Sequence, residues 1–247
     1  MGRAGRRGHR LVFAHNGRRR ATRQKQNAYK KSPHVAYYNG SALMVKGIFI
    51  TFEGPEGSGK STHIQLLAAY LRSKGRRVVL TREPGGTALA AGIRKLLLEG
   101  SDDLSPMAEL FLYEADRAQH VHETLAPALR KGKIVLCDRY TDSTLAYQGF
   151  GRGLEMQTVK ALNAIAAGGL KPDLTILLDV PVERGLKQAK AKKNRHDRLE
   201  RAGLAFHKRV RAGFLKLAKQ EPRRFRVIEQ QKTIHETQTL IRKALGL

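Results

Sequence analysis

The sequence has no tryptophan, only one cysteine and no long apolar run. The single cysteine, Cys137, excludes an internal disulfide and is typical of proteins from the reducing cytosol. No apolar stretch reaches the ~20 residues that a membrane-spanning helix needs, so we expect a cytoplasmic protein without a membrane partner. The 247 residues, 41% of them hydrophobic, are enough to bury a substantial core in one or two domains.

Acidic residues are scarce, and they are absent from the first 45 positions, which contain eleven Lys and Arg. The whole chain has a formal net charge of +26, so this segment accounts for a large part of it. Residues 1–43 have no sustained periodicity, and we predict that this basic extension is disordered. Three explanations stay open: a targeting peptide, a nucleic-acid-binding arm, or a start codon placed too early, with the true start at Met44. A nucleic-acid partner is expected only through this extension.

A complete phosphate-binding motif, G-x-x-x-x-G-K-S, occupies residues 54–61. An apolar strand is predicted just before it, at 47–52, and a helical pattern begins at Lys60. Glycines let successive backbone N–H groups turn toward phosphate oxygens, with help from the helix N-terminus. Lys60 can then neutralise the β- and γ-phosphates, and Ser61 can ligate Mg²⁺. The residues predicted to bind ATP are Gly54, Pro55, Glu56, Gly57, Ser58, Gly59, Lys60, Ser61 and Thr62.

Short apolar strands alternate with helical segments in the rest of the chain. Further strands are predicted at 77–81, 133–137, 174–178 and 225–228. Helices are predicted at 88–98, at 106–129 with a break near Pro127, and from about 233. This alternation is typical of an α/β fold whose parallel sheet is covered by helices on both faces. Ligands bind at the carboxyl ends of such strands, and the polar residues predicted there are Glu53, Arg82, Asp138, Arg139 and Asp179.

Four further segments are more specific. They are REPGGT at 82–87, LYEADR at 112–117, DRYTDSTLAYQG at 138–149 and DRLE at 197–200. With the phosphate loop, they make the chain from Met44 to its end (44–247) resemble bacterial thymidylate kinases. The resemblance implies a three-layer P-loop NTPase fold, a five-stranded parallel sheet in the order 2-3-1-4-5, and a small lid at about 187–201. It also implies transfer of the γ-phosphate of ATP to dTMP, giving dTDP for dTTP synthesis, with Mg²⁺ and usually in a homodimer.

Two cations and one carboxylate at strand ends resemble the family's acceptor-phosphate site. Arg139 looks like the clamp on the phosphate of dTMP, a task that suits a bidentate guanidinium. Arg82 can assist from the next strand end, unless it is only a solvated charge. Asp138 is expected to bind Mg²⁺ through water or to orient Arg139; a structural ion pair is the alternative.

The resemblance also assigns contacts to the acceptor nucleoside. Glu56 matches a carboxylate that accepts the 3′-hydroxyl of the sugar; the alternative is a solvated surface residue. Tyr113 lies four residues before Arg117, so both project from one helical face, and the family stacks an aromatic ring on thymine and bonds its carbonyl with the arginine. The remaining implied dTMP contacts are Ser143, Thr144, Tyr147 and Gln148, of which Tyr147 is expected to screen against a 2′-hydroxyl.

Catalysis of phosphoryl transfer consists mainly of positioning and of neutralising charge. The phosphate loop has no arginine, so a lid guanidinium should stabilise the transition state. Arg198 is the first choice and Arg195 the second, and with Lys60, Asp138 and Arg139 they form the predicted catalytic set. Two alternative functions stay open: a kinase for another nucleoside monophosphate, and a P-loop protein that binds nucleic acid.

Overall fold

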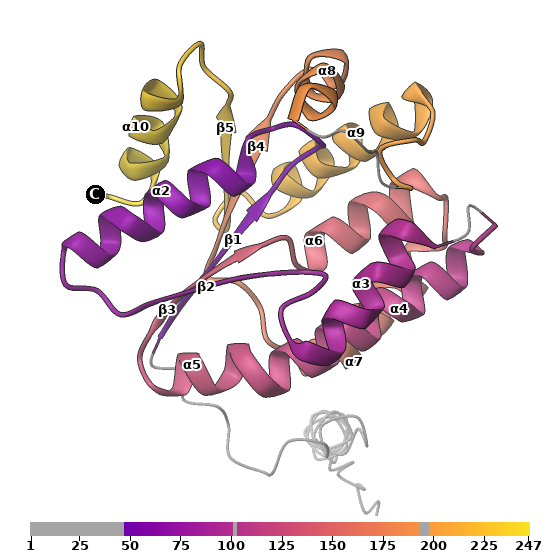
Figure 1. Ribbon diagram of the computed structural model, residues 1–247, viewed down its shortest axis with the longest axis horizontal. Coiled ribbons are helices and arrows are strands. Elements are labelled where there is room, and N and C mark those ends of the chain that lie inside the picture. Colours follow the sequence, from indigo (N-terminus) through magenta and orange to yellow (C-terminus); the bar gives the residue numbers. More distant parts are fainter. Residues whose placement is uncertain (1–46, 101–102, 193–197) are drawn as a thin grey trace, which may run out of the picture. The chain divides into compact units, whose positions relative to one another are not determined.

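The computed structural model describes residues 47–100, 103–192 and 198–247, and the account below concerns this part of the chain. The basic extension (1–43), the alternative start Met44 and the lid candidate Arg195 lie outside the described residues. At the centre is a five-stranded parallel sheet in the order β2-β3-β1-β4-β5, which confirms the predicted order (Figure 1). The strands are β1 (Ile48–Glu53), β2 (Val78–Arg82), β3 (Ile134–Asp138), β4 (Leu174–Asp179) and β5 (Phe225–Glu229).

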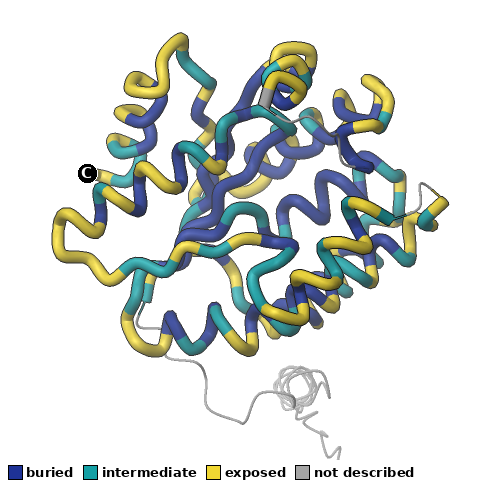
Figure 2. Tube along the Cα trace, viewed as in Figure 1, coloured by how far each residue is buried: buried dark blue, intermediate teal, exposed yellow. Residues whose placement is uncertain are grey.

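Helices cover both faces of the sheet, and the side chains of β1 alternate between them. Ile50 and Phe52 point to the face covered by α2 (Lys60–Ser73) and α10 (Ile234–Ala244). Phe49 packs on the opposite face with the helical run 106–130. The inner strands β1, β3 and β4 are mostly buried, whereas the edge strands β2 and β5 are more exposed (Figure 2). None of the described helices is long and apolar enough to cross a membrane.

The segment 106–130 departs from its prediction. It consists of α4 (Pro106–His120), a π-helical turn η3 (Val121–Leu125) and α5 (Ala126–Arg130), without a change of direction at Pro127. Pro127 lies in the first turn of α5, a position where a missing N–H group is tolerated. The remaining helical elements are α3 (Ala88–Glu99), α6 (Thr141–Thr144), π-helical η4 (Leu145–Gly151), α7 (Met156–Ala166), α8 (Val182–Lys192) and α9 (Leu204–Gln220).

Candidate active site

The phosphate loop leaves β1 at Gly54 and enters α2 at Lys60. Gly57 and Gly59 have φ angles of 70° and 87°, in the left-handed region that favours glycine. A Cβ atom on Gly57 would lie 1.9 Å from the carbonyl oxygen of Gly185, so the loop can pack this closely on α8 only without a side chain there. The motif therefore has the tight backbone conformation that phosphate binding requires.

The ammonium group of Lys60 is buried and folds back onto its own loop. It donates to the carbonyl oxygens of Gly54 and Pro55, both at 2.9 Å, and to the hydroxyl of Ser58 at 3.3 Å. Burial and the nearby charge of Arg139 lower the pKa of Lys60 to about 8. In this structure carbonyl oxygens thus hold the Lys60 ammonium group, which in this motif binds phosphate oxygens when a nucleotide is present.

The two predicted magnesium ligands are in contact. Ser61 Oγ donates to Asp138 Oδ2 at 2.9 Å, where the start of α2 meets the end of β3. A hydroxyl and a carboxylate suit Mg²⁺, which keeps several waters and binds substrate phosphates as well. The described residues contain no group of three or more His, Cys, Asp or Glu that could hold a metal by themselves. The donor set therefore fits a phosphate-bound Mg²⁺.

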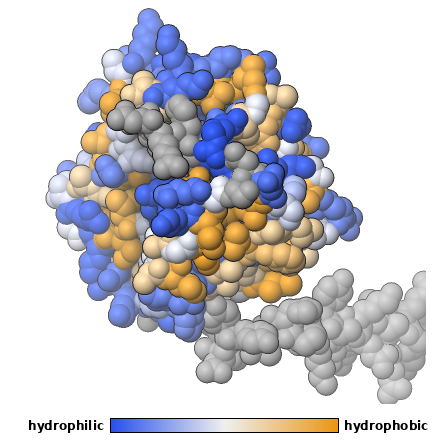
Figure 3. All heavy atoms as spheres, turned by 45° about the vertical axis from the view of Figure 1, so that its right-hand side comes forward, coloured by the Kyte–Doolittle hydropathy of each residue, from blue (hydrophilic) through white to orange (hydrophobic). Residues whose placement is uncertain are grey.

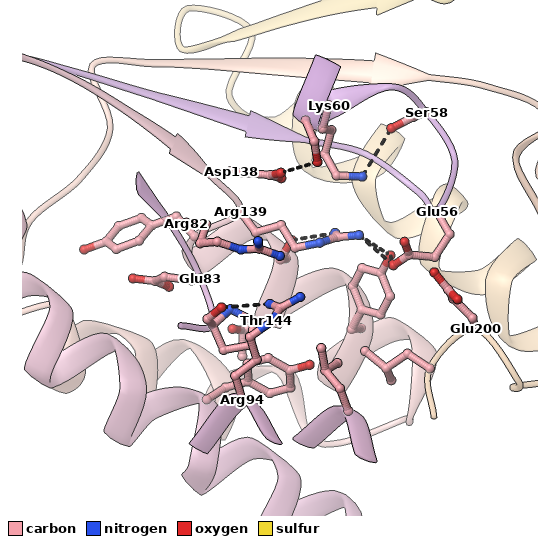
Figure 4. Close-up of a pocket in the computed structure, with 18 of the residues that line it drawn as sticks. Glu56, Ser58, Lys60, Arg82, Glu83, Arg94, Asp138, Arg139, Thr144 and Glu200 are labelled. Carbon is pink, nitrogen blue, oxygen red and sulfur yellow. Dashed lines mark hydrogen bonds and ion pairs between the residues drawn. The ribbon is translucent and has the colours of Figure 1, made fainter. Parts of the chain in front are cut away.

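Arg139 connects β3 to the phosphate loop. Its φ of 73° is unusual for a residue with a side chain, and its backbone N–H donates to the carbonyl oxygen of Phe52 at 3.0 Å. The guanidinium donates to Glu56 Oε1 at 2.7 Å, and the hydroxyl of Tyr147 donates to the same oxygen at 3.0 Å (Figure 4). The strained backbone and these contacts together aim Arg139 into the pocket.

Arg117, on α4, is fully buried and makes five contacts, as many as its guanidinium has N–H groups. Nε and Nη2 both meet Glu83 Oε2, at 3.0 and 2.9 Å. Nη1 donates to Glu114 at 2.8 Å and also to Asn163, and Nη2 donates to Thr144 at 3.0 Å. Burial disfavours its charge, but Glu83 and Glu114 outweigh burial and raise the pKa of Arg117. The arginine is a permanent cation with a fixed orientation.

One pocket brings most of the predicted residues together (Figure 4). The predicted residues in its lining are 56–62, Arg82, Tyr113, Arg117, Asp138, Arg139, Ser143, Thr144, Tyr147 and Gln148. Gly54 and Pro55 do not line it; their carbonyl oxygens accept from Lys60. Residues from the phosphate loop, α2, β2, β3, α4 and the helical segment after β3 therefore meet at the carboxyl edge of the sheet, as expected.

Comparison with known proteins agrees with this geometry. The sequence model of the family described as thymidylate kinase matches residues 52–241. The chain belongs to the thymidylate kinase family. A thymidylate kinase from Geobacter sulfurreducens is 54% identical over 205 residues, which cover 81% of this chain and 96% of that protein. One from Trichlorobacter lovleyi is 54% identical over 188 residues, covering 74% of this chain and 89% of that protein.

A solved structure is also similar. The crystal structure of thymidylate kinase from Ehrlichia chaffeensis matches with a TM-score of 0.67 and 37% sequence identity, over 81% of this chain and 99% of that one. The thymidylate kinase fold therefore extends over the whole sheet and the helices around it.

Arg198, the first choice for the lid cation, does not line the pocket. The side chain of Arg198 is buried, and its guanidinium pairs with Glu109 on α4 and donates to the carbonyl oxygen of Leu97 at 3.1 Å. The next two residues, Leu199 and Glu200, do line the pocket. A catalytic role for Arg198 stays a prediction.

Sequence reasoning missed Arg94, and it placed Glu53 at the carboxyl edge of the sheet without predicting its partners. Arg94 of α3 lines the pocket and donates to the carbonyl oxygen of Pro84 at 2.8 Å. Its position on an amphipathic helix gave no sign of this role. Glu53 is buried at the end of β1 and accepts from the Tyr140 backbone N–H at 2.8 Å and from Ser143 Oγ at 2.5 Å. Burial, with the charge of Asp142, raises the pKa of Glu53 to about 8.

A second hollow adjoins the phosphate loop on another side. It shares Gly57, Gly59 and Thr62 with the first pocket and is bounded by α8 and by residues 230–234, which lead into α10. No motif predicted this hollow, because its lining is mostly glycines and uncharged polar side chains from distant segments.

Proposed function

We propose that the chain transfers the γ-phosphoryl group of ATP to dTMP, forming dTDP for dTTP synthesis. Family membership supports this activity. The observation that carries it here is that a phosphate loop and a fixed cationic acceptor cluster line the same pocket. Two mutually repelling phosphates can be held in line there, because Lys60, Arg139 and Arg82 approach from separate segments.

On the donor side, the backbone N–H groups of the loop bind the β- and γ-phosphates. Lys60 exchanges the carbonyl oxygens of Gly54 and Pro55 for phosphate oxygens. Ser61 and Asp138 would hold Mg²⁺, which when bound would neutralise negative charge on the transferred phosphoryl group. The second hollow, next to the loop, accepts the donor nucleoside.

On the acceptor side, Arg139 binds the phosphate of dTMP, with Arg82 and Arg94 close by. Tyr113 packs against the pyrimidine ring, and Gln148 also lines this part of the pocket. Arg117 presents the Thr144 hydroxyl to the base: because the oxygen of Thr144 accepts from Arg117, its O–H group is left to donate.

Tyr147 and Glu56 recognise the sugar of dTMP. Tyr147 and Glu56, joined by a 3.0 Å hydrogen bond, flank the position of the sugar. Glu56 accepts the 3′-hydroxyl, and Tyr147 obstructs a 2′-hydroxyl. Transfer is direct between the two nucleotides, without a covalent enzyme intermediate.

The lid cation is assigned to Arg195, the second choice from the sequence. The described contacts of Arg198 engage its guanidinium with Glu109 and Leu97, so Arg198 would have to break a buried ion pair to reach a phosphate.

A homodimer is part of the proposal. Its support is a set of exposed apolar side chains on α3 and α4: Leu89 (59% exposed), Leu96 (58%), Met107 (38%) and Phe111 (54%). Figure 3 turns this side forward and shows hydrophobic residues gathered on the lower half of the view. Sedimentation equilibrium of wild type and Phe111→Glu tests this, and a monomeric wild type contradicts it. A cytoplasmic location stays a prediction.

The proposed activity is tested by initial rates with ATP and dTMP, dUMP, dCMP, dGMP or thymidine. We expect the highest kcat/KM for dTMP. A higher value for any other monophosphate would make the chain a kinase for that nucleotide instead. Nucleic-acid binding by the chain starting at Met44 that resists moderate salt would favour the remaining alternative, which the comparisons do not favour.

A further inference from the structure

The proposed function leaves unexplained a buried carboxylate that joins the acceptor pocket to the segment after α8. Glu109 lies in the first turns of α4, is fully buried and does not line the pocket. We propose that Glu109 is a positioning residue for the acceptor nucleotide: it fixes Gln148 on one side and, through Arg198, the pocket-lining pair Leu199 and Glu200 on the other. This inference rests on the proposed function.

Both oxygens of Glu109 are saturated with donors. Oε1 accepts from Gln148 Nε2 at 2.6 Å and from Arg152 Nε at 3.2 Å. Oε2 accepts from Arg152 Nη2 at 2.9 Å and from Arg198 Nη2. Burial disfavours the charge, but the hydrogen bonds from Arg152 and Gln148 and the charges of both arginines lower the pKa of Glu109. It is therefore an anion that holds three side chains in fixed positions through four hydrogen bonds.

Arg198 attaches its segment to the end of α3 as well. Its backbone N–H donates to the carbonyl oxygen of Leu98, and its Nε donates to that of Leu97, both at 3.1 Å. These carbonyl groups belong to the last turn of α3, where they have no helical partner. A cation at the C-terminus of a helix is also favoured by the helix dipole. Arg198 thus caps α3 and pairs with α4 at the same time.

The contacts of Arg198 hold the two residues that follow it, Leu199 and Glu200, at the pocket. Leu199 is buried in the same apolar cluster as Leu110 of α4, and Glu200 follows directly. Gln148, Leu199 and Glu200 line the acceptor pocket, and all three depend on Glu109 directly or through Arg198. Loss of the carboxylate charge would free Gln148 and the pair Leu199 and Glu200 at the same time. It would also leave Arg152 and Arg198 without their anion.

The test compares Glu109→Gln, Arg198→Met and the double variant, with Glu123→Gln as the matched control. Glu123 is an exposed glutamate of η3 that accepts a surface hydrogen bond from Gln119. Calorimetry measures the Kd of dTMP and, separately, of a non-hydrolysable ATP analogue; the coupled assay gives kcat. We expect each single variant to raise the Kd of dTMP about tenfold and to leave the Kd of the ATP analogue within about twofold of wild type. Glu123→Gln should leave both Kd values within about twofold of wild type.

The double variant decides whether the two residues act as one unit. We expect it to bind dTMP about as weakly as the worse single variant, because both remove the same connection. Fully additive effects, or an unchanged dTMP Kd in Glu109→Gln, would overturn the proposal. So would an Arg198→Met variant with wild-type dTMP affinity and a strongly reduced kcat, which would make Arg198 a catalytic cation. A merely structural role would lower Tm without separating the two affinities.

Two further results must be distinguished from failure of the positioning role: a variant that does not fold, and a wild type without the proposed activity. If Glu109→Gln does not fold, Arg198→Lys replaces it; it keeps the charge but cannot contact Leu97 and Glu109 through one planar fork, and the same dTMP criterion applies. If wild type itself neither binds nor phosphorylates dTMP, the proposed function fails, a result distinct from failure of the positioning role.

Discussion

The acceptor side of the pocket and the phosphate loop are built from different parts of the chain. On the acceptor side, side chains hold side chains: Arg117 is fixed by Glu83, Glu114, Asn163 and Thr144 in a buried network. In the phosphate loop, Lys60 is held mostly by carbonyl groups of the loop itself.

This difference indicates how each substrate meets the enzyme. The acceptor side is organised before any ligand arrives, so little ordering remains to be done when dTMP binds. The phosphate loop must exchange its own carbonyl oxygens for phosphate oxygens, so its charge arrangement changes when ATP binds. Four substitutions test this contrast.

Arg117→Met should have the largest effect, on stability. It leaves Glu83 and Glu114 buried without their cation, which we expect to lower the free energy of unfolding by about 3–5 kcal/mol. Arg82→Met, at an exposed pocket position, should change it by less than about 0.5 kcal/mol. Urea unfolding measures both, and equal midpoints for the two variants would contradict a structural network around Arg117.

Lys60→Ala changes the phosphate loop and should lower kcat. Without the ammonium group no mobile cation meets the β- and γ-phosphates, and kcat should fall about 10²–10³-fold while the protein stays folded. The matched control is Lys74→Ala, at the exposed far end of α2. A near-normal kcat in Lys60→Ala would refute its role in the loop.

Glu56→Gln tests where the two sides join, because Glu56 belongs to the loop but pairs with Arg139 and Tyr147. Losing a charge-assisted hydrogen bond should raise KM for dTMP about tenfold and change kcat less. Tyr147→Phe removes only the neutral partner and should have a smaller effect on dTMP. An unaltered KM in Glu56→Gln would contradict the contact of Glu56 with the 3′-hydroxyl.

Glu53→Gln should change how stability depends on pH, whereas the other substitutions act at a single pH. Because burial raises the pKa of Glu53 from 4.5 to about 8, the folded state keeps a proton that the unfolded state loses in this range. Protonated Glu53 makes its full contribution to the free energy of unfolding below pH 4.5. As the pH rises from 4.5 to about 8, this contribution is lost, by up to about 1.4 kcal/mol per pH unit. Urea unfolding between pH 5 and 9 should give a flatter profile for Glu53→Gln than for wild type, and parallel profiles would contradict the raised pKa.

The sequence predicted the strands to within one residue at each end, because each is a short apolar run that ends at a polar residue. It also placed Ser61 beside Asp138 and Tyr113 near Arg117, because motif spacing and the common sheet edge fix those positions. It did not reveal the partners of Arg198 and Arg117. Glu114 lies three residues before Arg117 on the same helix, but Glu109 and Glu83 lie far from their arginines in sequence. The pairing of such distant residues depends on packing that no local pattern encodes.

The most direct measurement is a crystal structure with dTMP and a non-hydrolysable ATP analogue. We expect the pyrimidine beside Tyr113 and Thr144, with Arg117 still bonded to Glu83 and Glu114, and Lys60 moved from the carbonyl groups of its loop to phosphate oxygens. A pyrimidine bound elsewhere, or Lys60 still on Gly54 and Pro55 with phosphate present, would contradict the account.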